Sequence, residues 1–168
     1  MSIEIRRAGT ADIPFIMATE RGPGFDDLVG RWEEDRHRAE MKMPESRYLI
    51  GLRSGHPAGF ALFQNLDDPF GNVLLKRIAV SKPGSGFGSQ FLAAVLTAAF
   101  GLPETYRVWL DVFLHNERAR HVYRTFGFRE DGVLREAYAK PDDTRLSLAL
   151  MSILRPEWEA RVETPRDC

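Results

Sequence analysis

Residues 83–88 read Pro-Gly-Ser-Gly-Phe-Gly and lie between an apolar run and the start of an expected helix. Glycines let the backbone approach a ligand closely, and the first turn of a helix offers unpaired N–H groups to an anion. The segment is therefore a candidate cradle for a pyrophosphate. It is not a Walker loop, since no Lys-Ser/Thr follows the glycines, and its spacing is not GxGxxG. An ordinary strand-to-helix turn is the alternative interpretation.

A second candidate segment, residues 116–128, places Asn116 at the start of a short helix and Tyr123 on its apolar stripe. A phenol with an ordinary pKa of ~10 can protonate a departing thiolate. Helix capping by Asn116 and core packing of Tyr123 are the alternatives. The two segments follow strands that we expect to be neighbours, so both should face one crevice at the carboxyl ends of those strands. This pairing points to transfer of an acyl group from a phosphate-bearing cofactor.

The elements that position these segments follow from apolar periodicity. Alternating or continuous apolar residues predict strands, and i, i+3, i+4 spacing predicts helices. The expected strands are near residues 3–6, 48–52, 58–63, 73–80, 106–113, 128–138 and 145–154, and the expected helices near 11–21, 25–32, 87–100 and 116–126. Strand–helix–strand order predicts a parallel pair between residues 73–80 and 106–113 in an otherwise antiparallel sheet. The expected fold class is mixed α/β in three layers.

Length and composition are those of one globular domain: 168 residues, 43% apolar and 28% charged. The formal net charge of −1 gives no reason to expect a nucleic acid or an anionic membrane as partner. The single cysteine, Cys168, excludes a disulfide framework within the chain. We expect a cytoplasmic protein without signal peptide or membrane span, with one domain over residues 1–155 and a polar, weakly ordered tail over 156–168.

The two segments together resemble the signatures of the GNAT superfamily of acyl-CoA N-acyltransferases, and the resemblance extends over roughly residues 3–154. The first signature, Gln or Arg, two residues, Gly, any residue, then Gly or Ala, falls on residues 83–88. Gly86 and Gly88 match it, whereas Pro83 stands at the Gln/Arg position. Asn116, Ala119, Tyr123 and the Gly127-Phe128 pair match the second signature.

This resemblance implies a GNAT-like fold and acetyl-CoA as cofactor. The residues that it implies for CoA binding lie on the strand, the glycine turn and the tyrosine helix: Ile78, Ala79, Val80, Gly84, Ser85, Gly86, Phe87, Gly88, Asn116, Ala119 and Tyr123. The strand backbone would pair with the pantetheine arm, and an amide near Ile78 or Ala79 would stabilise the oxyanion. Tyr123 would act as general acid. Arg118, Arg120 and Arg124 are candidates for a CoA phosphate, or else exposed helix charges.

The implied reaction is direct attack of an amine on the thioester. The amine must first lose a proton, but Leu74 stands where related enzymes often carry a glutamate. Asp111, in the middle of a strand, and Glu20, at the end of the first helix, are the catalytic candidates for this step, with Glu33 a further one. A hydrogen-bonded strand-edge aspartate and a solvated glutamate are the alternatives.

The acceptor is expected to be a small-molecule amine or a protein amino group. Residues 26–40 carry six acidic and three basic side chains, which favours a cationic amine, although a solvated helix face explains the same charges. We expect Trp32 in the core, His37 and His121 at the surface, and no metal site. A homodimer is left open. Leu74 and Pro83 also keep open a non-catalytic acyl-CoA-binding domain on the same fold.

Overall fold

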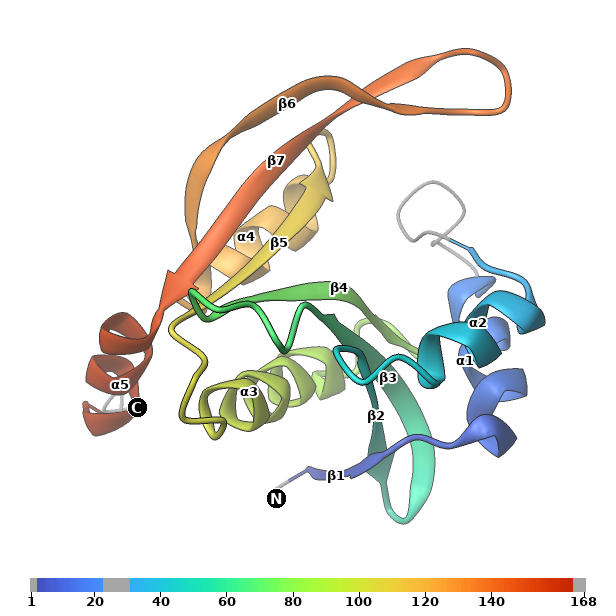
Figure 1. Cartoon of the computed structure of the whole chain (residues 1–168), viewed down its shortest axis with the longest axis horizontal. Helices are drawn as coiled ribbons and strands as arrows, with labels where there is room; N and C mark the ends of the chain where they lie inside the picture. Colours follow the sequence, from blue (N-terminus) through green and yellow to red (C-terminus); the bar gives the residue numbers. More distant parts are fainter. Residues whose placement is uncertain (1–2, 23–30, 165–168) are drawn as a thin grey trace.

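The computed structural model describes residues 3–22 and 31–164. Its strands, all in one sheet, are β1 (Glu4–Arg7), β2 (Arg47–Arg53), β3 (His56–Gln64), β4 (Asn72–Val80), β5 (Arg107–Phe113), β6 (Arg129–Ala139) and β7 (Arg145–Leu154). The helices are a 3-10 turn (Thr10–Asp12), α1 (Ile13–Glu20), α2 (Glu34–Met41), α3 (Phe87–Phe100), α4 (Glu117–Thr125) and α5 (Arg155–Glu163). Figure 1 shows their arrangement.

The strand order is β1-β2-β3-β4-β5-β7-β6. Every neighbouring pair is antiparallel except β4–β5, which is parallel, so the predicted central pair is confirmed. The parallel register is short: it runs from Asn72↔Arg107 to Leu74↔Trp109. Beyond these residues the two strands separate, while β3 continues along β4 as far as Gly59↔Val80. The half of β4 nearer its carboxyl end therefore has one edge without a strand partner.

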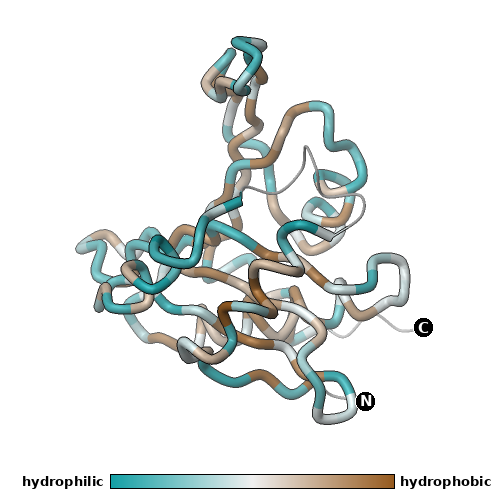
Figure 2. The backbone as a smooth tube through the Cα atoms, turned by 90° about the vertical axis from the view of Figure 1, so that its right-hand side faces the viewer, coloured by the Kyte–Doolittle hydropathy of each residue, from teal (hydrophilic) through white to brown (hydrophobic). Residues whose placement is uncertain are grey.

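Two apolar clusters lie on opposite faces of the sheet and give the three-layer architecture. On one face, Phe91, Leu92 and Val95 of α3 pack with strand residues such as Phe63 and Val108. On the other, Ile16 of α1 packs with the β2 and β3 residues Tyr48, Ile50, Phe60 and Leu62. Brown apolar stretches of the tube in Figure 2 run through the middle of the molecule, where these clusters lie. The mixed α/β prediction is confirmed.

α3 packs so closely on the sheet that the strand residue beneath it must be glycine. A Cβ added to Gly51 of β2 would come within 2.6 Å of the Phe91 ring. Real Cβ atoms do not approach so closely, so the ring lies directly on the strand backbone. This contact holds α3, and with it the glycine turn at its start, close to the sheet.

The helices near the two ends of the chain differ from the expectations. The predicted helix at 25–32 falls mostly on residues outside the described ranges, and residues 31–33 are not helical. A helix that was not predicted, α2, follows at Glu34–Met41; it has few apolar residues and buries only His37. The tail was expected to have little order, but residues 155–163 form α5. Trp158 of α5 is 9% exposed and stacks on Phe100 with ring centroids 5.9 Å apart, which anchors the helix.

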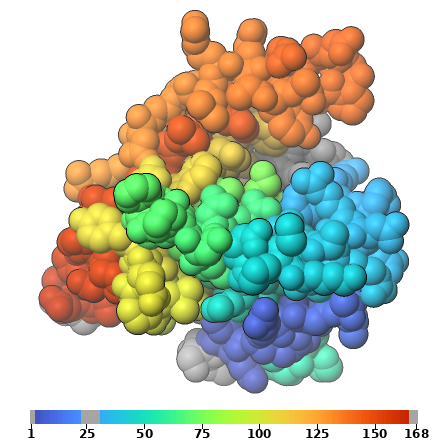
Figure 3. All heavy atoms as spheres, viewed as in Figure 1, coloured from blue at the N-terminus to red at the C-terminus, as the bar shows by residue number. Residues whose placement is uncertain are grey.

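The β6–β7 hairpin extends beyond the rest of the sheet. Every residue of β6 is exposed, and Figure 3 shows the hairpin as a ridge along one side of the molecule. None of the helices in the described part of the chain is long and apolar enough to cross a membrane.

Candidate active site

A cavity of about 870 Å³ opens where β4 and β5 separate. The β4 and β5 walls continue into the glycine turn and α4, and the chain preceding α2 and the β6–β7 hairpin complete the enclosure. The residues that line the cavity include Arg31, Trp32, Arg36, Lys76, Arg77, Ile78, Ala79, Val80, Pro83, Gly84, Gly86, Gly88, Asp111, Phe113, Asn116, Arg118, Ala119, Tyr123, Tyr138 and Leu148. The two segments singled out in the sequence therefore share one cavity.

The glycine turn ends β4 and opens α3, as predicted. Gly84 and Gly86 have φ of +82° and +79°, a left-handed conformation that glycine adopts without strain. A Cβ at either position would meet no atom within 4 Å, so the backbone borders open space. Gly86 is the N-cap of α3, and no side chain caps the first turn. The N–H groups of that turn are thus available to an anion.

Two of the predicted cofactor residues turn their side chains elsewhere. The Ser85 hydroxyl donates to the Lys82 carbonyl oxygen at 3.0 Å, and Phe87 is buried against Phe91 with ring centroids 5.6 Å apart. Neither residue lines the cavity, so only their backbone groups remain for a ligand. Pro83 does line it, in the position that differs from the family signature.

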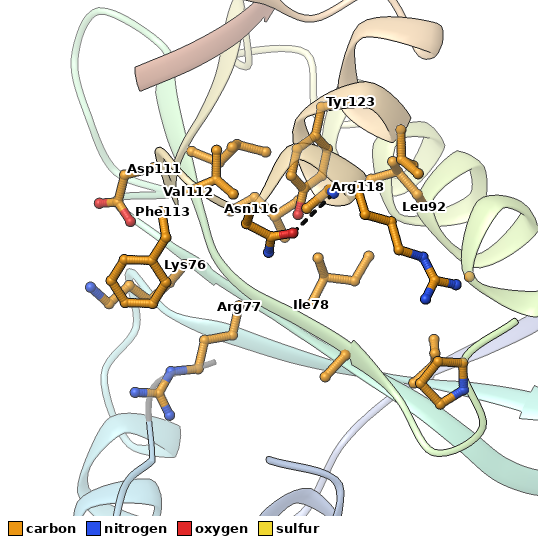
Figure 4. Close-up of a pocket in the computed structure, with 18 of the residues that line it drawn as sticks. Lys76, Arg77, Ile78, Leu92, Asp111, Val112, Phe113, Asn116, Arg118 and Tyr123 are labelled. Carbon is orange, nitrogen blue, oxygen red and sulfur yellow. Dashed lines mark hydrogen bonds between the residues drawn. The ribbon is translucent and has the colours of Figure 1, made fainter. Parts of the chain in front are cut away.

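The unpaired edge of β4 forms the floor of the cavity at Ile78, Ala79 and Val80. Free N–H and C=O groups on a sheet edge can pair with an extended ligand as another strand would. Across from this edge, α4 begins at Asn116, whose side-chain oxygen accepts the Ala119 N–H at 3.2 Å. Asn116 thus caps the helix and also lines the cavity: its oxygen is engaged in the cap, and its amide nitrogen points away from α4 (Figure 4).

Of the three arginines on α4, only Arg118 lines the cavity. Arg120 and Arg124 are instead paired with acidic side chains: both bind Glu130, at 2.6 and 3.1 Å, and Arg120 also binds Glu117. Figure 4 shows Arg118 on the side of α4 that faces Leu92 of α3. It is therefore the cation of this helix that can reach an anion at the turn.

Tyr123 points from α4 into the cavity, toward the strand that carries Ile78 (Figure 4). Its ring packs on Phe128 with centroids 5.5 Å apart. Burial, and to a lesser degree the negative charge of Asp111, raise the pKa of the hydroxyl to about 12. The phenol is thus held in its protonated form at neutral pH, and no hydrogen bond from it to another described residue is seen.

Asp111 lies where β5 has lost its β4 partner, and its exposed carboxylate lines the cavity. The alternative of an aspartate bound to loop amides is not seen, because no hydrogen bond joins this carboxylate to the described residues. Figure 4 shows it beside Phe113 and on the same side of the site as Lys76. Asp111 and Tyr123 are therefore the candidate acid–base groups that the structure brings together.

Glu20 lies outside the cavity, in a buried ionic cluster. It is fully buried, forms an ion pair with Arg77, and its other oxygen lies 3.1 Å from Nε2 of His37. Nδ1 of His37 in turn lies 2.7 Å from the Tyr48 hydroxyl. The solvated-glutamate alternative and the surface position of His37 were both wrong, since each polar atom has found a partner in the interior. Glu33 is exposed and pairs with Arg21 at 3.1 Å.

The wall farthest from the glycine turn was not found from the sequence. It carries Arg36, Lys76 and Arg77, with Tyr138 of the hairpin. Trp32, expected in the core, is only partly buried and lies between two guanidinium groups, Arg36 at 4.2 Å and Arg77 at 4.1 Å from its ring centroid. One signal was present: Lys76 and Arg77 interrupt an otherwise apolar run from Val73 to Val80.

Comparisons with known proteins agree with this geometry. Residues 16–128 match the model of the acetyltransferase (GNAT) family. The probable spermine N(1)-acetyltransferase of Bacillus subtilis subsp. natto (strain BEST195) is 30% identical over 105 residues, which are 60% of this chain and 68% of that protein.

Solved structures share the fold at lower identity. The Vibrio cholerae spermidine N-acetyltransferase in complex with CoA and spermine is 17% identical, with a TM-score of 0.82 over 94% of this chain and 98% of that one. The Escherichia coli ribosomal-protein-S18-alanine N-acetyltransferase is 21% identical, with a TM-score of 0.74 over 90% of this chain and 93% of that one.

Proposed function

From the premise that this chain belongs to the acetyltransferase (GNAT) family and is an acetyl-CoA-dependent N-acetyltransferase, we propose that it acetylates a primary amine by direct attack on the thioester, with Tyr123 as general acid. The observation that carries this proposal is the single cavity between the separated strands β4 and β5. It contains an uncapped helix start at one end and Tyr123 with Asp111 further along.

The residues present fit CoA. Backbone amides from Gly84 to Gly88 would hold its pyrophosphate, because the turn borders open space and the first turn of α3 is uncapped. The free edge of β4 at Ile78 and Val80 would hold the pantetheine arm by main-chain hydrogen bonds. CoA supplies the activated thioester; the protein supplies its orientation.

Tyr123 supports the chemical step through its position and protonation state. Because burial raises its pKa to about 12, the hydroxyl keeps its proton at neutral pH and can donate a hydrogen bond to the sulfur as negative charge develops there. An amide of the β4 edge near Ile78 or Ala79 would stabilise the oxyanion of the thioester carbonyl.

Asp111 is the better of the two candidate bases. Its carboxylate is exposed in the cavity, so it can orient the incoming amine and accept its proton directly or through water. Glu20 has no such access, since both its oxygens are engaged in the buried cluster. We assign Glu20 to the positioning of Arg77 and α2.

For the acceptor, the names of the relatives suggest either polyamines or the amino terminus of a protein. We propose a primary amine as the common chemistry. The whole of residues 1–155 is proposed as one acetyltransferase domain, to which α5 adds its packing against Phe100.

The proposal is tested by adding acetyl-CoA and a panel of amines, spermine and an alanine-terminated peptide among them, to the purified chain and measuring release of free thiol. Saturable acetyl-CoA binding with amine-dependent thiol release is expected. Absence of binding would contradict the cofactor assignment. Tight binding without thiol release across the panel would favour the non-catalytic acyl-CoA-binding alternative.

A further inference from the structure

Building on the proposed amine acetylation, we infer that the acceptor carries an oxyanion, a carboxylate or a phosphate, which Arg36 and Lys76 bind in the same cavity. Lys76 is four residues before Val80, which places it about 13 Å along β4 from the end of that strand, at ~3.3 Å per residue, and the glycine turn lies beyond that end. This end of the cavity is therefore separate from the proposed pyrophosphate cradle.

The charges on the described lining residues are strongly unequal. Five are cationic, Arg31, Arg36, Lys76, Arg77 and Arg118, and one is anionic, Asp111. Arg77 is neutralised by Glu20, Arg31 has an interaction of its own, and Arg118 lies on the cofactor side. Arg36 and Lys76 remain, and neither forms an ion pair with an acidic side chain within residues 3–22 and 31–164. Two cations in a cavity that have no acidic partner among the described residues make a site for an anion.

The Arg36 guanidinium is held in place by stacking. Its central carbon lies 4.2 Å from the centroid of the Trp32 ring, and that of Arg77 lies 4.1 Å from the same ring. Burial above all, and more weakly the charge of Arg36, lower the pKa of Arg77, whereas Glu20 raises it. Two like charges are thus close together, and an oxyanion beside Arg36 would relieve their repulsion. A stacked guanidinium also keeps its edge free for two parallel hydrogen bonds to an oxyanion.

Lys76 lies at an irregularity in β4. Leu62 pairs with Arg77 and Phe63 with Leu75, so Lys76 has no partner on β3. Lys76 lines the cavity together with its neighbours Leu75 and Arg77, on the edge of β4 that is no longer paired with β5. Figure 4 shows Lys76 on the side of the site where Asp111 also lies.

This arrangement selects among amines. An acceptor with an amino group near Asp111 and an oxyanion near Lys76 and Arg36 satisfies charges of both signs. A polycation would place a second ammonium group against those cations, and like charges brought together at an interface are strongly unfavourable. The acceptor class is thus an amino carboxylate or amino phosphate rather than a polyamine.

The test compares three amines of equal carbon number: 4-aminobutanoate, 1-butylamine and 1,4-diaminobutane. A second comparison, of 2-aminoethyl phosphate with 3-aminopropanoate, distinguishes a phosphate from a carboxylate. Thiol release gives kcat/KM, and calorimetric titration of the whole chain in the presence of CoA gives Kd for each amine. We expect the amino carboxylate to exceed butylamine by about a hundredfold and the diamine to be poorest, since two charge-assisted hydrogen bonds, one from each cation, supply about tenfold each.

The variants Lys76→Met and Arg36→Met should each reduce the ratio of amino carboxylate to butylamine about tenfold, by the same loss of a charged hydrogen bond. Lys42→Met is the matched control, since Lys42 is exposed and outside the cavity, and should leave the ratio unchanged. Preference for the diamine, or an equal effect of the control, would overturn the inference. If no amine releases thiol, the proposed function fails. The inference is then decided by the Kd values: 4-aminobutanoate should still bind more tightly than butylamine, and Lys76→Met should reduce that difference.

Discussion

Replacement of Tyr123 by Phe removes one oxygen atom from the cavity and leaves the aromatic ring in place. No hydrogen bond from the hydroxyl to another described residue is seen, and the ring contact with Phe128, at 5.5 Å between centroids, does not involve it. The free energy of unfolding should therefore change by less than about 1 kcal/mol, the usual net value of one hydrogen bond. The whole effect should appear in turnover.

General-acid catalysis contributes about 10²–10⁴-fold to rate. We expect a loss in kcat near 10²-fold, at the lower end of that range, because burial raises the pKa of Tyr123 to about 12 and makes the phenol a weak acid. The Kd for acetyl-CoA should change by less than about threefold, since one hydrogen bond in a large ligand contact is lost. Steady-state thiol release measures kcat, and titration with acetyl-CoA in the absence of amine measures Kd.

The pH dependence supplies an independent check. A phenol with a pKa of about 12 stays protonated between pH 8 and pH 10, so kcat of the wild-type chain should not fall in that interval through ionisation of Tyr123. Tyr106→Phe is the matched control, because Tyr106 is 51% exposed and outside the cavity. Equal losses in kcat and in CoA affinity, or a large loss in the control, would refute the assignment of Tyr123 as the acid.

Three further predictions concern the turn, the buried cluster and α5. Gly86→Ala should weaken CoA binding about tenfold in a calorimetric titration, because a left-handed residue with a Cβ costs roughly 1–2 kcal/mol. Gly132→Ala is the control, since Gly132 borders open space and has no positive φ. Glu20→Gln should lower the free energy of unfolding by about 3–5 kcal/mol, because it leaves a buried guanidinium unpaired. Urea denaturation measures the free energy of unfolding, and Glu33→Gln, at an exposed glutamate, is the control. If Glu20→Gln instead loses activity but keeps its full stability, Glu20 is catalytic. Trp158→Ala should cost about 3–5 kcal/mol by the same measurement, and no loss would mean that α5 is dispensable.

The central part of the fold was predictable because its side chains follow simple periodicities. Apolar alternation or continuity locates the strands, and the stripe with Phe91 and Leu92 locates α3. The parallel pairing of β4 with β5 follows from strand–helix–strand order, and it brings Gly86 and Tyr123 to one cavity. What periodicity does not show is where that pairing ends. The cavity exists because the pairing of β4 with β5 ends after Leu74, and no residue type in the sequence marks that end.

The buried polar cluster and the wall near Lys76 were not predictable for a different reason. Glu20, His37 and Arg77 are buried only because each satisfies another, and their separation along the chain hides the match. A single such residue looks like an exposed charge. In the same way α2 has no apolar stripe, since what it buries is His37. The acidic character of residues 26–40 suggested a cationic acceptor. Among the described residues of this stretch, the charged side chains that line the cavity are those of Arg31 and Arg36, and both are basic.

The β6–β7 hairpin has a consequence for how this enzyme can change. Tyr138 and Leu148 enter the cavity from beyond residue 128, where the family match ends, whereas the glycine turn and the tyrosine helix lie within it. The hairpin thus adds two side chains to a cavity whose proposed CoA and acceptor residues, Asp111, Lys76 and Arg36 among them, lie within the matched stretch. Exchange of the hairpin would leave the glycine turn, Tyr123 and Asp111 in place and change the part of the cavity wall that carries Tyr138 and Leu148. The exposed hairpin is accordingly a segment in which substitutions can reshape the cavity without altering any residue of the family match.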